Sequence, residues 1–246
     1  MFRPGKSALD AVGVTRRRCW RQDWVIDLVI IGFFDNLSWD LVLKALRHHT
    51  DIPWILLYVE RWLKAPVQRT DGSLEERTKG SPQGAVFSPL LSNLFLHYAV
   101  DEWLRRNFPH VQFARYADDA VIHARSLTEA KRVLEAVRLR LRECGLELHP
   151  EKTKTVYCQD SDRRGSHDHI QFDFLGYTFR PRRAKNRRGK MFVSFLPAVS
   201  NKAANSIRAT IRSWRLGATR NNQSLEELAK FVNPYAVSYT HLTLPT

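Results

Sequence analysis

The chain has 246 residues, of which 43% are hydrophobic and 26% are charged. This composition is ordinary for one large globular domain and excludes low-complexity disorder and collagen-like repeats. The longest apolar run, residues 28–34, is far shorter than the ~20 residues that a membrane helix needs, so no membrane partner is expected. The three cysteines form no CxxC pair, which argues against a zinc site or a disulfide scaffold and favours a reducing, cytoplasmic setting.

The charge is strongly unbalanced, because 39 Lys and Arg residues against 25 Asp and Glu residues give a net charge of +14. Residues 181–220 contain eleven of these cations and no acidic residue. Such a stretch is either a solvated basic linker or a surface that follows the phosphates of a nucleic acid. The second interpretation predicts a nucleic-acid-associated protein. The candidate binding residues are Arg182, Arg183, Lys185, Arg187, Arg188 and Lys190.

Apolar spacing, caps and turn residues predict alternating strands and helices. Residues 23–31 form a β-branched run typical of a buried strand. Further strands are expected on both sides of Asp118-Asp119, within residues 112–124, and within residues 146–180. Asp71-Gly72 is a hairpin signal. Helices are expected at residues 39–49, 52–63, 89–107, 126–144 and 201–216. This order predicts an α+β fold built on an antiparallel sheet.

Asp118 and Asp119 are an unusual pair for a hairpin tip, where Asn-Gly or Asp-Gly is the ordinary choice. Neighbouring carboxylates repel one another, so the pair is either an exposed acidic turn or a site for hard divalent cations. Mg²⁺ prefers oxygen ligands and often completes its shell with phosphate oxygens and water. A paired-Asp turn in a basic chain therefore points to phosphoryl transfer on a nucleic acid.

The motifs around this turn resemble those of reverse transcriptases encoded by group II introns. Tyr116-Ala117-Asp118-Asp119 matches their YADD box, and the other boxes follow in the family's order. Residues 32–36 (GFFDN) resemble the first catalytic box and residues 81–84 (SPQG) the nucleotide-contacting box. Residues 145–154 resemble the motif after the palm helix, residues 174–177 (FLGY) the primer-grip turn, and residues 2–5 (FRPG) the segment before the palm.

The resemblance implies a right-hand polymerase palm, an antiparallel sheet with packed helices, followed by the start of a helical thumb. Residues 1–180 are expected to be the palm, with the fingers lying before Met1. Residues 181–236 are expected to be a basic linker and the start of the thumb or maturase domain. Residues 237–246 resemble a translated vector sequence and are expected to be a non-native tail.

The resemblance also implies roles for individual residues. Asp118 and Asp119 would hold Mg²⁺ together with the main-chain carbonyl of Ile30. Lys152 would donate a proton to the leaving pyrophosphate, or is simply a solvated lysine. The partners implied are an intron RNA template, a DNA primer and deoxynucleotides. Phe34, Gln83 and Gly84 would bind the nucleotide, and Leu175 and Gly176 would contact the primer. The simpler alternatives are that Phe34 is a core aromatic residue and that Gln83 is a turn residue.

One position departs from the family pattern. The first catalytic box should read Asp, aliphatic, Lys, Gly, Phe, Phe, Asp, but this register places Val29 at the catalytic Asp and Ile31 at the Lys. Asp27 shares the strand face of residue 29 yet lies ~6.6–7 Å along the strand, which is too far for a metal bond of ~2.0–2.1 Å. Asp35 lies beyond the glycine and is expected to face solvent or to cap the next helix.

These patterns predict an RNA-directed DNA polymerase of the group II intron reverse transcriptase and maturase type, a nucleotidyltransferase of a bacterial mobile element. Its two-Mg²⁺ site lacks one carboxylate at Val29. The rival hypothesis is a catalytically dead, RNA-binding, maturase-like protein that assists intron splicing. A non-functional reading-frame fragment is the third alternative, supported by the vector-like tail.

Overall fold

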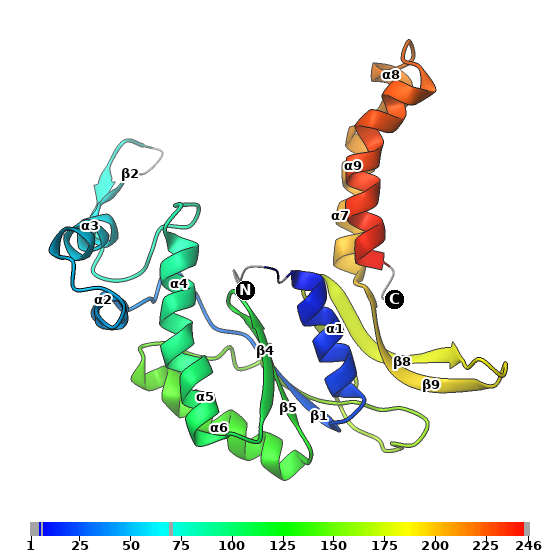
Figure 1. Ribbon diagram of the computed structural model, residues 1–246, viewed down its shortest axis with the longest axis horizontal. Helices are drawn as coiled ribbons and strands as arrows, with labels where there is room; N and C mark the ends of the chain where they lie inside the picture. Colours follow the sequence, from blue (N-terminus) through cyan, green and yellow to red (C-terminus); the bar gives the residue numbers. More distant parts are fainter. Residues whose placement is uncertain (1–4, 6, 69–70, 244–246) are drawn as a thin grey trace.

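A computed structural model describes residues 5, 7–68 and 71–243. Its centre is a four-stranded antiparallel sheet with the strand order β4-β5-β1-β6 (Figure 1). The strands are β1 (Trp24–Leu28), β4 (Gln112–Tyr116), β5 (Asp119–Ala124) and β6 (Lys154–Tyr157). The predicted strand pair around Asp118 is present, and β1 is adjacent to β5 in the sheet. The strand predicted at residues 23–31 is shorter than expected, because β1 ends at Leu28 and Ile30 forms only an isolated bridge.

Alternation along β1 divides the core between the two faces of the sheet. Ile26 contributes to the core beneath α4 (Ser88–Leu96), the π-helix η1 (His97–Asp101), α5 (Glu102–Asn107) and α6 (Leu127–Glu143). Val25 contributes to the core on the opposite face, beneath α1 (Ala8–Cys19) and a second sheet. Both side chains are fully buried. The period of two along a strand thus places helices on one face and α1 with the second sheet on the other.

The helix α1 was not among the predicted elements. Ser7 and Asp10 form a reciprocal capping box at its start, and the side chains of Ala11, Val12, Thr15 and Cys19 are buried along one stripe. Arginines at positions 16–18 lie in its last turn, where positive charge stabilises the helix terminus. They interrupt the apolar pattern that identifies an amphipathic helix in a sequence.

A small lobe lies beside the central sheet (Figure 1). It consists of α2 (Trp39–Arg47), α3 (Pro53–Lys64) and the short strands β2 (Val67–Gln68) and β3 (Leu74–Glu75). Ser38 caps α2 as predicted, because its side chain accepts a hydrogen bond from the Leu41 backbone N–H. Asp71 and Gly72 lie between β2 and β3, in the predicted hairpin.

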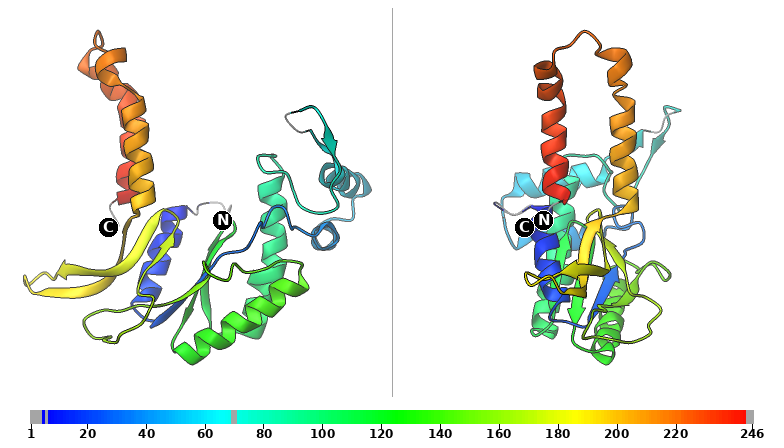
Figure 2. Two further views of the ribbon diagram at one scale, coloured as in Figure 1. Left: turned by 180° about the vertical axis from the view of Figure 1, so that it is seen from behind. Right: turned by 90° about the vertical axis from the view of Figure 1, so that its right-hand side faces the viewer.

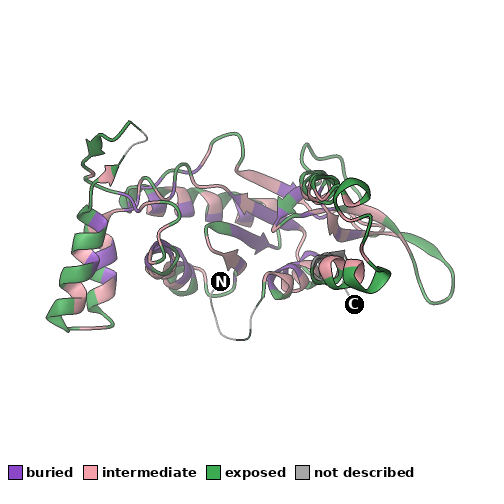
Figure 3. Ribbon diagram, turned by 90° about the horizontal axis from the view of Figure 1, so that it is seen from above, coloured by how far each residue is buried: buried purple, intermediate pink, exposed green. Residues whose placement is uncertain are grey.

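The second sheet has the order β7-β8-β9 and corrects one expectation. Its strands are β7 (Phe172–Phe174), β8 (Tyr177–Lys185) and β9 (Met191–Val199). The first part of the expected basic linker therefore forms a long β-hairpin, whose nine-residue strands pair from Tyr177↔Val199 to Lys185↔Met191. Figure 3 shows that burial declines from the base of this hairpin to its tip.

A helical hairpin rises from the end of β9 (Figure 2). It contains α7 (Asn201–Ser213), α8 (Leu216–Thr219) and α9 (Leu225–Thr243). α7 confirms the predicted helix near residue 201, whereas α9 was not predicted and continues into the segment expected to be a tail. Within the described residues, none of the helices is long and apolar enough to span a membrane.

Candidate active site

The YADD motif forms the tip of the β4–β5 hairpin. Tyr116 pairs with Asp119, so Ala117 and Asp118 make a two-residue turn. Ala117 has a φ of 54°, in the left-handed region that a residue with a Cβ rarely occupies. The strained tip presents both carboxylates outward, since Asp118 and Asp119 are each exposed.

The Arg115 side chain holds this strained turn in place. Its guanidinium donates a hydrogen bond of 2.7 Å to the Ala117 carbonyl and another of 3.0 Å to the Asn93 side chain. It also forms a bidentate ion pair with Asp101, with distances of 2.8 and 2.6 Å. The side chains of Arg115 and Asp101 are only 10% and 8% exposed. Sequence reasoning missed this pair, because the two residues lie on different elements and belong to no motif.

Val29 lies beside Asp119. β1 and β5 pair Asp27 with Val121 and Leu28 with Ala120, and the next step of this register brings Val29 opposite Asp119. Both residues line one open cleft of about 700 Å³. The strand predicted to carry the first catalytic position therefore lies next to the YADD turn, and an apolar side chain occupies that position.

The backbone around Val29 is fixed by the segment before β6. The Val29 carbonyl accepts a hydrogen bond of 2.7 Å from the His149 backbone N–H, and the Val29 N–H donates to the Thr153 hydroxyl at 3.3 Å. Ile30 forms an isolated β-bridge with Leu148. The two hydrogen bonds of this bridge join the neighbouring residues, from the Ile31 N–H to the Glu147 carbonyl and from the His149 N–H to the Val29 carbonyl. The Ile30 carbonyl is thus outside the hydrogen bonds of this bridge, as a main-chain metal ligand requires.

The cleft beside Val29 mixes carboxylates with lysines. Lys152 lines it, as its predicted role requires. Lys154 lies directly opposite Asp27 across the β1–β6 pairing. Residues 168–173, at the start of the second sheet, and Lys202 of α7 also line the cleft. Its charged lining residues are Asp27, Asp119, Asp168, Asp173, Lys152, Lys154 and Lys202.

Burial, and then neighbouring carboxylates, change the ionisation of two carboxyl groups here. Burial raises the pKa of Asp27 to about 7, with Asp119 and Asp173 adding repulsion and Lys154 opposing it. Desolvation by the surrounding atoms, and then the Asp118 carboxylate, raise the pKa of Asp119. Asp27 is therefore a mixture of neutral and ionised forms near pH 7.

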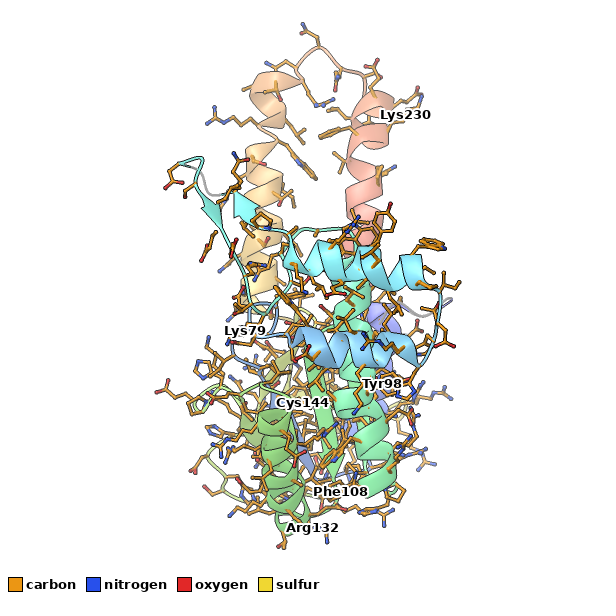
Figure 4. The ribbon with its side chains drawn as sticks, turned by 90° about the vertical axis from the view of Figure 1, so that its left-hand side faces the viewer. Lys79, Tyr98, Phe108, Arg132, Cys144 and Lys230 are labelled. Carbon is orange, nitrogen blue, oxygen red and sulfur yellow. The ribbon has the colours of Figure 1, made fainter. Side chains whose placement is uncertain are left out.

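The GFFDN and SPQG boxes contact one another through their backbones. The Ser81 N–H donates to the Phe34 carbonyl at 2.7 Å, and the Gly80 N–H donates to the Leu37 carbonyl at 2.8 Å. A Cβ atom on Gly80 would lie only 2.8 Å from the Asp35 carbonyl oxygen, so this close approach requires glycine. Lys79 joins the two boxes further through a hydrogen bond of 2.9 Å to Asn36 (Figure 4).

The predicted nucleotide-binding residues lie outside the lining of the Asp119 cleft. Among the described residues, that lining includes none of Phe34, Gln83 and Gly84. Gln83 and Gly84 are exposed, whereas Phe34 is half-buried and packs edge-on against Phe33 at 5.2 Å between ring centroids. Phe34 therefore packs against the hydrophobic core, as its simpler interpretation expects. Asp35 is exposed and Ser38 caps α2, so Asp35 is not the helix cap.

The predicted primer-grip residues form the turn between β7 and β8. Phe174 pairs with Tyr177, and both turn residues have positive φ angles, 51° for Leu175 and 81° for Gly176. A two-residue turn with positive φ at both positions matches the twist of the strands it joins. The Gly176 carbonyl accepts a hydrogen bond of 2.9 Å from Ser200, the residue that caps α7. This turn therefore supports the base of the helical hairpin.

The six candidate nucleic-acid-binding residues do not form one surface. In β8, Arg183 and Lys185 share the strand face of Phe179, which is buried toward α1. Arg182 points to the other face, where its guanidinium donates to the Leu196 carbonyl at 3.3 Å. The remaining three cations, Arg187, Arg188 and Lys190, lie at the exposed hairpin tip.

The acidic residues of the cleft do not complete a metal site. Over the described parts of the chain, no group of three or more His, Cys, Asp or Glu side chains is arranged to hold a metal ion. Asp118 and Asp119 supply two carboxylates, and Val29 contributes no ligand atom. A second cleft, of about 410 Å³, lies on the other face of the sheet with Tyr98 and Cys144 on its walls (Figure 4). It contains none of the predicted site residues.

An antiparallel sheet with an acidic hairpin turn beside β1, followed by a second sheet and a helical hairpin, defines the palm and adjoining thumb of a right-hand polymerase. The sequence profile described as reverse transcriptase (RNA-dependent DNA polymerase) matches residues 1–179. This match covers well over half of the chain, so the chain belongs to the reverse transcriptase family.

Two relatives give the family match a finer context. Protein YkfC of Escherichia coli K12 is 28% identical, over 80% of this chain and 58% of that protein. The putative COX1/OXI3 intron 1 protein of Saccharomyces cerevisiae is 29% identical, over 42% of this chain and 12% of that protein. The intron protein bears out the resemblance to intron-encoded reverse transcriptases. The chain spans little more than half the length of YkfC and a small part of the yeast protein.

Solved structures agree on the fold. Apo telomerase from Candida tropicalis, truncated from its C-terminal domain, superposes with a TM-score of 0.55 at 14% identity, over 71% of this chain and 38% of that one. Telomerase from Candida albicans, in complex with a fragment of telomeric RNA, gives a TM-score of 0.52 at 15% identity, over 71% and 34% of the two chains. These similarities confirm the predicted α+β right-hand polymerase fold.

Proposed function

We propose that this chain is the palm and the beginning of the thumb of a group II intron-type reverse transcriptase, impaired in DNA synthesis by Val29. Its reaction would be RNA-directed DNA synthesis, with an intron RNA template, a DNA primer and deoxynucleotides as partners. The single observation that supports the impairment is that Val29 and Asp119, the residues next to the Leu28–Ala120 pair, line the same cleft.

The proposed metal is Mg²⁺, held by Asp118, Asp119 and the carbonyl of Ile30. Bound Mg²⁺ supplies positive charge to a reacting phosphate. Two adjacent carboxylates without a third are a poor fit to a pair of such ions, because each ion needs several oxygen ligands in near-octahedral geometry. A carboxylate at residue 29 would supply the absent ligand, and Lys152 lies in the same cleft for proton transfer.

The other assignments follow the family pattern. We propose residues 1–180 as palm, residues 181–236 as a basic hairpin and the start of the thumb, and residues 237–246 as a non-native tail. Phe34, Gln83 and Gly84 would meet the nucleotide, and Leu175 and Gly176 the primer. Such a protein would belong to a bacterial mobile element and act in the cytoplasm on nucleic acid.

The experiment compares the natural chain with Val29→Asp and with Val29→Asn, which has a similar shape but no charge. Mg²⁺ binding, measured by titration calorimetry, should strengthen at least about tenfold in Val29→Asp and remain weak in the Asn variant, because only the carboxylate adds a charged ligand. Equal Mg²⁺ affinity of the natural chain and Val29→Asp would contradict the register of the first catalytic box. Asp27 and Asp35 would then be the next residues to substitute.

DNA synthesis provides the second measurement. The chain would replace the corresponding part of YkfC, with and without Val29→Asp and Ile31→Lys, and be tested for primer extension on an RNA template. Val29→Asp alone should recover much of the rate, because loss of a catalytic group costs several kcal/mol and each ~1.4 kcal/mol is a factor of ten. Extension by the Val29 chimera as fast as by its Asp variant would overturn the proposed impairment.

The second candidate function is that of an RNA-binding maturase-like protein without polymerase activity. Val29 and the exposed Ile31 favour it, since both replace polar residues of the first catalytic box. In that case the Asp variants would gain Mg²⁺ affinity but no primer extension, while RNA binding by the basic hairpin would persist.

A further inference from the structure

Arginines at the end of α1 are not used by the proposed polymerase function. Arg17 and Arg21 are exposed, and Trp20 between them is 45% exposed. Charge at a helix terminus explains Arg17, which lies in the last turn. It does not explain Arg21, which follows the helix. The Trp20 ring lies under the Arg16 guanidinium, 5.1 Å from the ring centroid.

This end of α1 lies against the outer edge of β9. The Trp20 indole N–H donates a hydrogen bond of 3.1 Å to the Phe195 carbonyl. Two residues along the same edge, the Val193 N–H donates to the Ser161 hydroxyl at 2.7 Å. Arg164, exposed in the Ser161 loop, is thereby brought to the same edge. The edge strand is thus covered by α1 and by this loop.

The hairpin continues the basic surface outward. Arg183 pairs with Val193 in the β8–β9 register, and Lys185 lies two residues further toward the tip. Both are exposed and lie on the strand face that is turned toward α1. Figure 2, right, shows α1 and this hairpin side by side. We call the set the α1–hairpin surface. Its members are Arg17, Trp20, Arg21, Arg164, Arg183 and Lys185.

The cations of this surface are available to an external anion. Within the described residues, none of its five Lys and Arg side chains forms an ion pair. The nearby carboxylates of Asp23 and Asp160 are both engaged by Arg163, which also binds the carbonyls of Cys19 and Gln22. Asp162 is the exposed acid of the same loop. Positive charge therefore predominates.

From these contacts we propose that the α1–hairpin surface binds the phosphate backbone of folded RNA, as a second RNA contact separate from the cleft at Asp119. The inference rests on the proposed function only for the choice of RNA as the polyanion. Trp20 and the Asp119 cleft lie at opposite ends of β1, about 17 Å apart along residues 24–29 at ~3.4 Å per residue. The α1–hairpin surface and the Asp119 cleft are thus separate places on the chain.

An RNA backbone fits this surface better than a lipid membrane does. Exposed arginines spread over a helix end, a loop and a hairpin match a row of phosphates, each bound by charge with little sequence preference. Membrane insertion needs a broad apolar face beside the cations. Here Trp20 is the single aromatic member, and the Arg16 guanidinium already lies over one face of its ring.

The test measures binding of a fluorescein-labelled RNA hairpin to the full chain across a salt series. Arg17→Glu with Arg21→Glu should lower the log–log salt slope by about two, because each lost phosphate contact removes about one unit. The matched control is Arg106→Glu with Lys131→Glu, two exposed cations on α5 and α6 with the same change in net charge. It should leave the slope within about half a unit of the natural chain.

Three outcomes would overturn the inference. These are an unchanged slope in the α1 variant, an equal loss in both double variants, or a loss confined to binding of phosphatidylserine vesicles. Circular dichroism establishes that each variant is folded, and Arg17→Gln with Arg21→Gln repeats the test without charge reversal. Failure of the proposed function gives a different result, since Mg²⁺ binding by Val29→Asp depends on the cleft and not on this surface.

Discussion

The Arg115 guanidinium donates a hydrogen bond of 2.7 Å to the carbonyl of Ala117, the residue with left-handed backbone in the YADD turn. The same guanidinium is paired with Asp101 at the end of η1. The position of the Asp118 and Asp119 carboxylates therefore depends on a nearly buried ion pair, whose acidic partner belongs to the helical face of the sheet. This dependence can be measured.

Arg115→Met should destabilise the fold by about 3–5 kcal/mol, because it leaves the Asp101 carboxylate nearly buried without its main partner. Urea denaturation gives this free energy of unfolding. Arg138→Met is the control, since its ion pair with Glu135 is largely exposed and should contribute less than about 1 kcal/mol. Adding Asp101→Leu to Arg115→Met should restore much of the loss. A cost below that of the control would show that the pair does not support the turn.

Gly80→Ala should separate the GFFDN and SPQG boxes. The new Cβ would lie 2.8 and 2.9 Å from two backbone carbonyl oxygens, and φ is +86°. Overpacking and left-handed strain each cost about 1–3 kcal/mol, so the loss of stability should be about 2–6 kcal/mol. Gly84→Ala has a similar φ of +89° but open space, and should cost only about 1–2 kcal/mol. Equal thermal unfolding of the two variants would mean that the boxes can move apart freely.

His123 should make the protein less stable in acid. Its side chain is 1% exposed, and neither ring nitrogen has a hydrogen-bond partner among the residues that the structure describes. Burial, with Arg18 nearby, lowers the pKa of His123 to about 3. Below about pH 6.5 His123 is protonated in the unfolded chain but stays neutral in the folded chain. The free energy of unfolding therefore falls by about 1.4 kcal/mol for each pH unit between pH 6.5 and pH 3. His123→Leu should remove this loss, as followed by urea denaturation at each pH.

Asp27 should make the protein less stable as the pH rises, which is the opposite of the effect of His123. With a folded pKa of about 7 and an unfolded pKa of about 3.9, its contribution is fully present below pH 4 and is lost as the pH rises to 7. Asp27→Asn, in EDTA, should therefore stabilise the protein at pH 7 relative to pH 4, by a few kcal/mol at most. In the natural chain the slopes of Asp27 and His123 oppose one another between pH 4 and 6.5. A natural chain whose stability is no flatter there than that of either variant would contradict this balance.

Local signals in the sequence determined the elements and their motifs. Ser38 and Ser126 cap the helices that they predict, and Gly145 follows α6 with a positive φ. The YADD turn joins the strands expected on either side of it. Each of these depends on a few neighbouring residues, whose backbone preferences and hydrogen bonds operate within one turn of chain. The order of the boxes was therefore enough to predict a polymerase palm.

Tertiary structure decided which distant residues meet. The pairing of β1 with β5 brought Val29 opposite Asp119, and burial around Asp101 made Arg115 the support of the turn. Antiparallel pairing turned the expected linker into a two-faced hairpin, because successive side chains of a strand point to opposite sides. Such relationships depend on strand register and on the low dielectric of buried sites, both of which exist only once segments far apart in the chain have packed together.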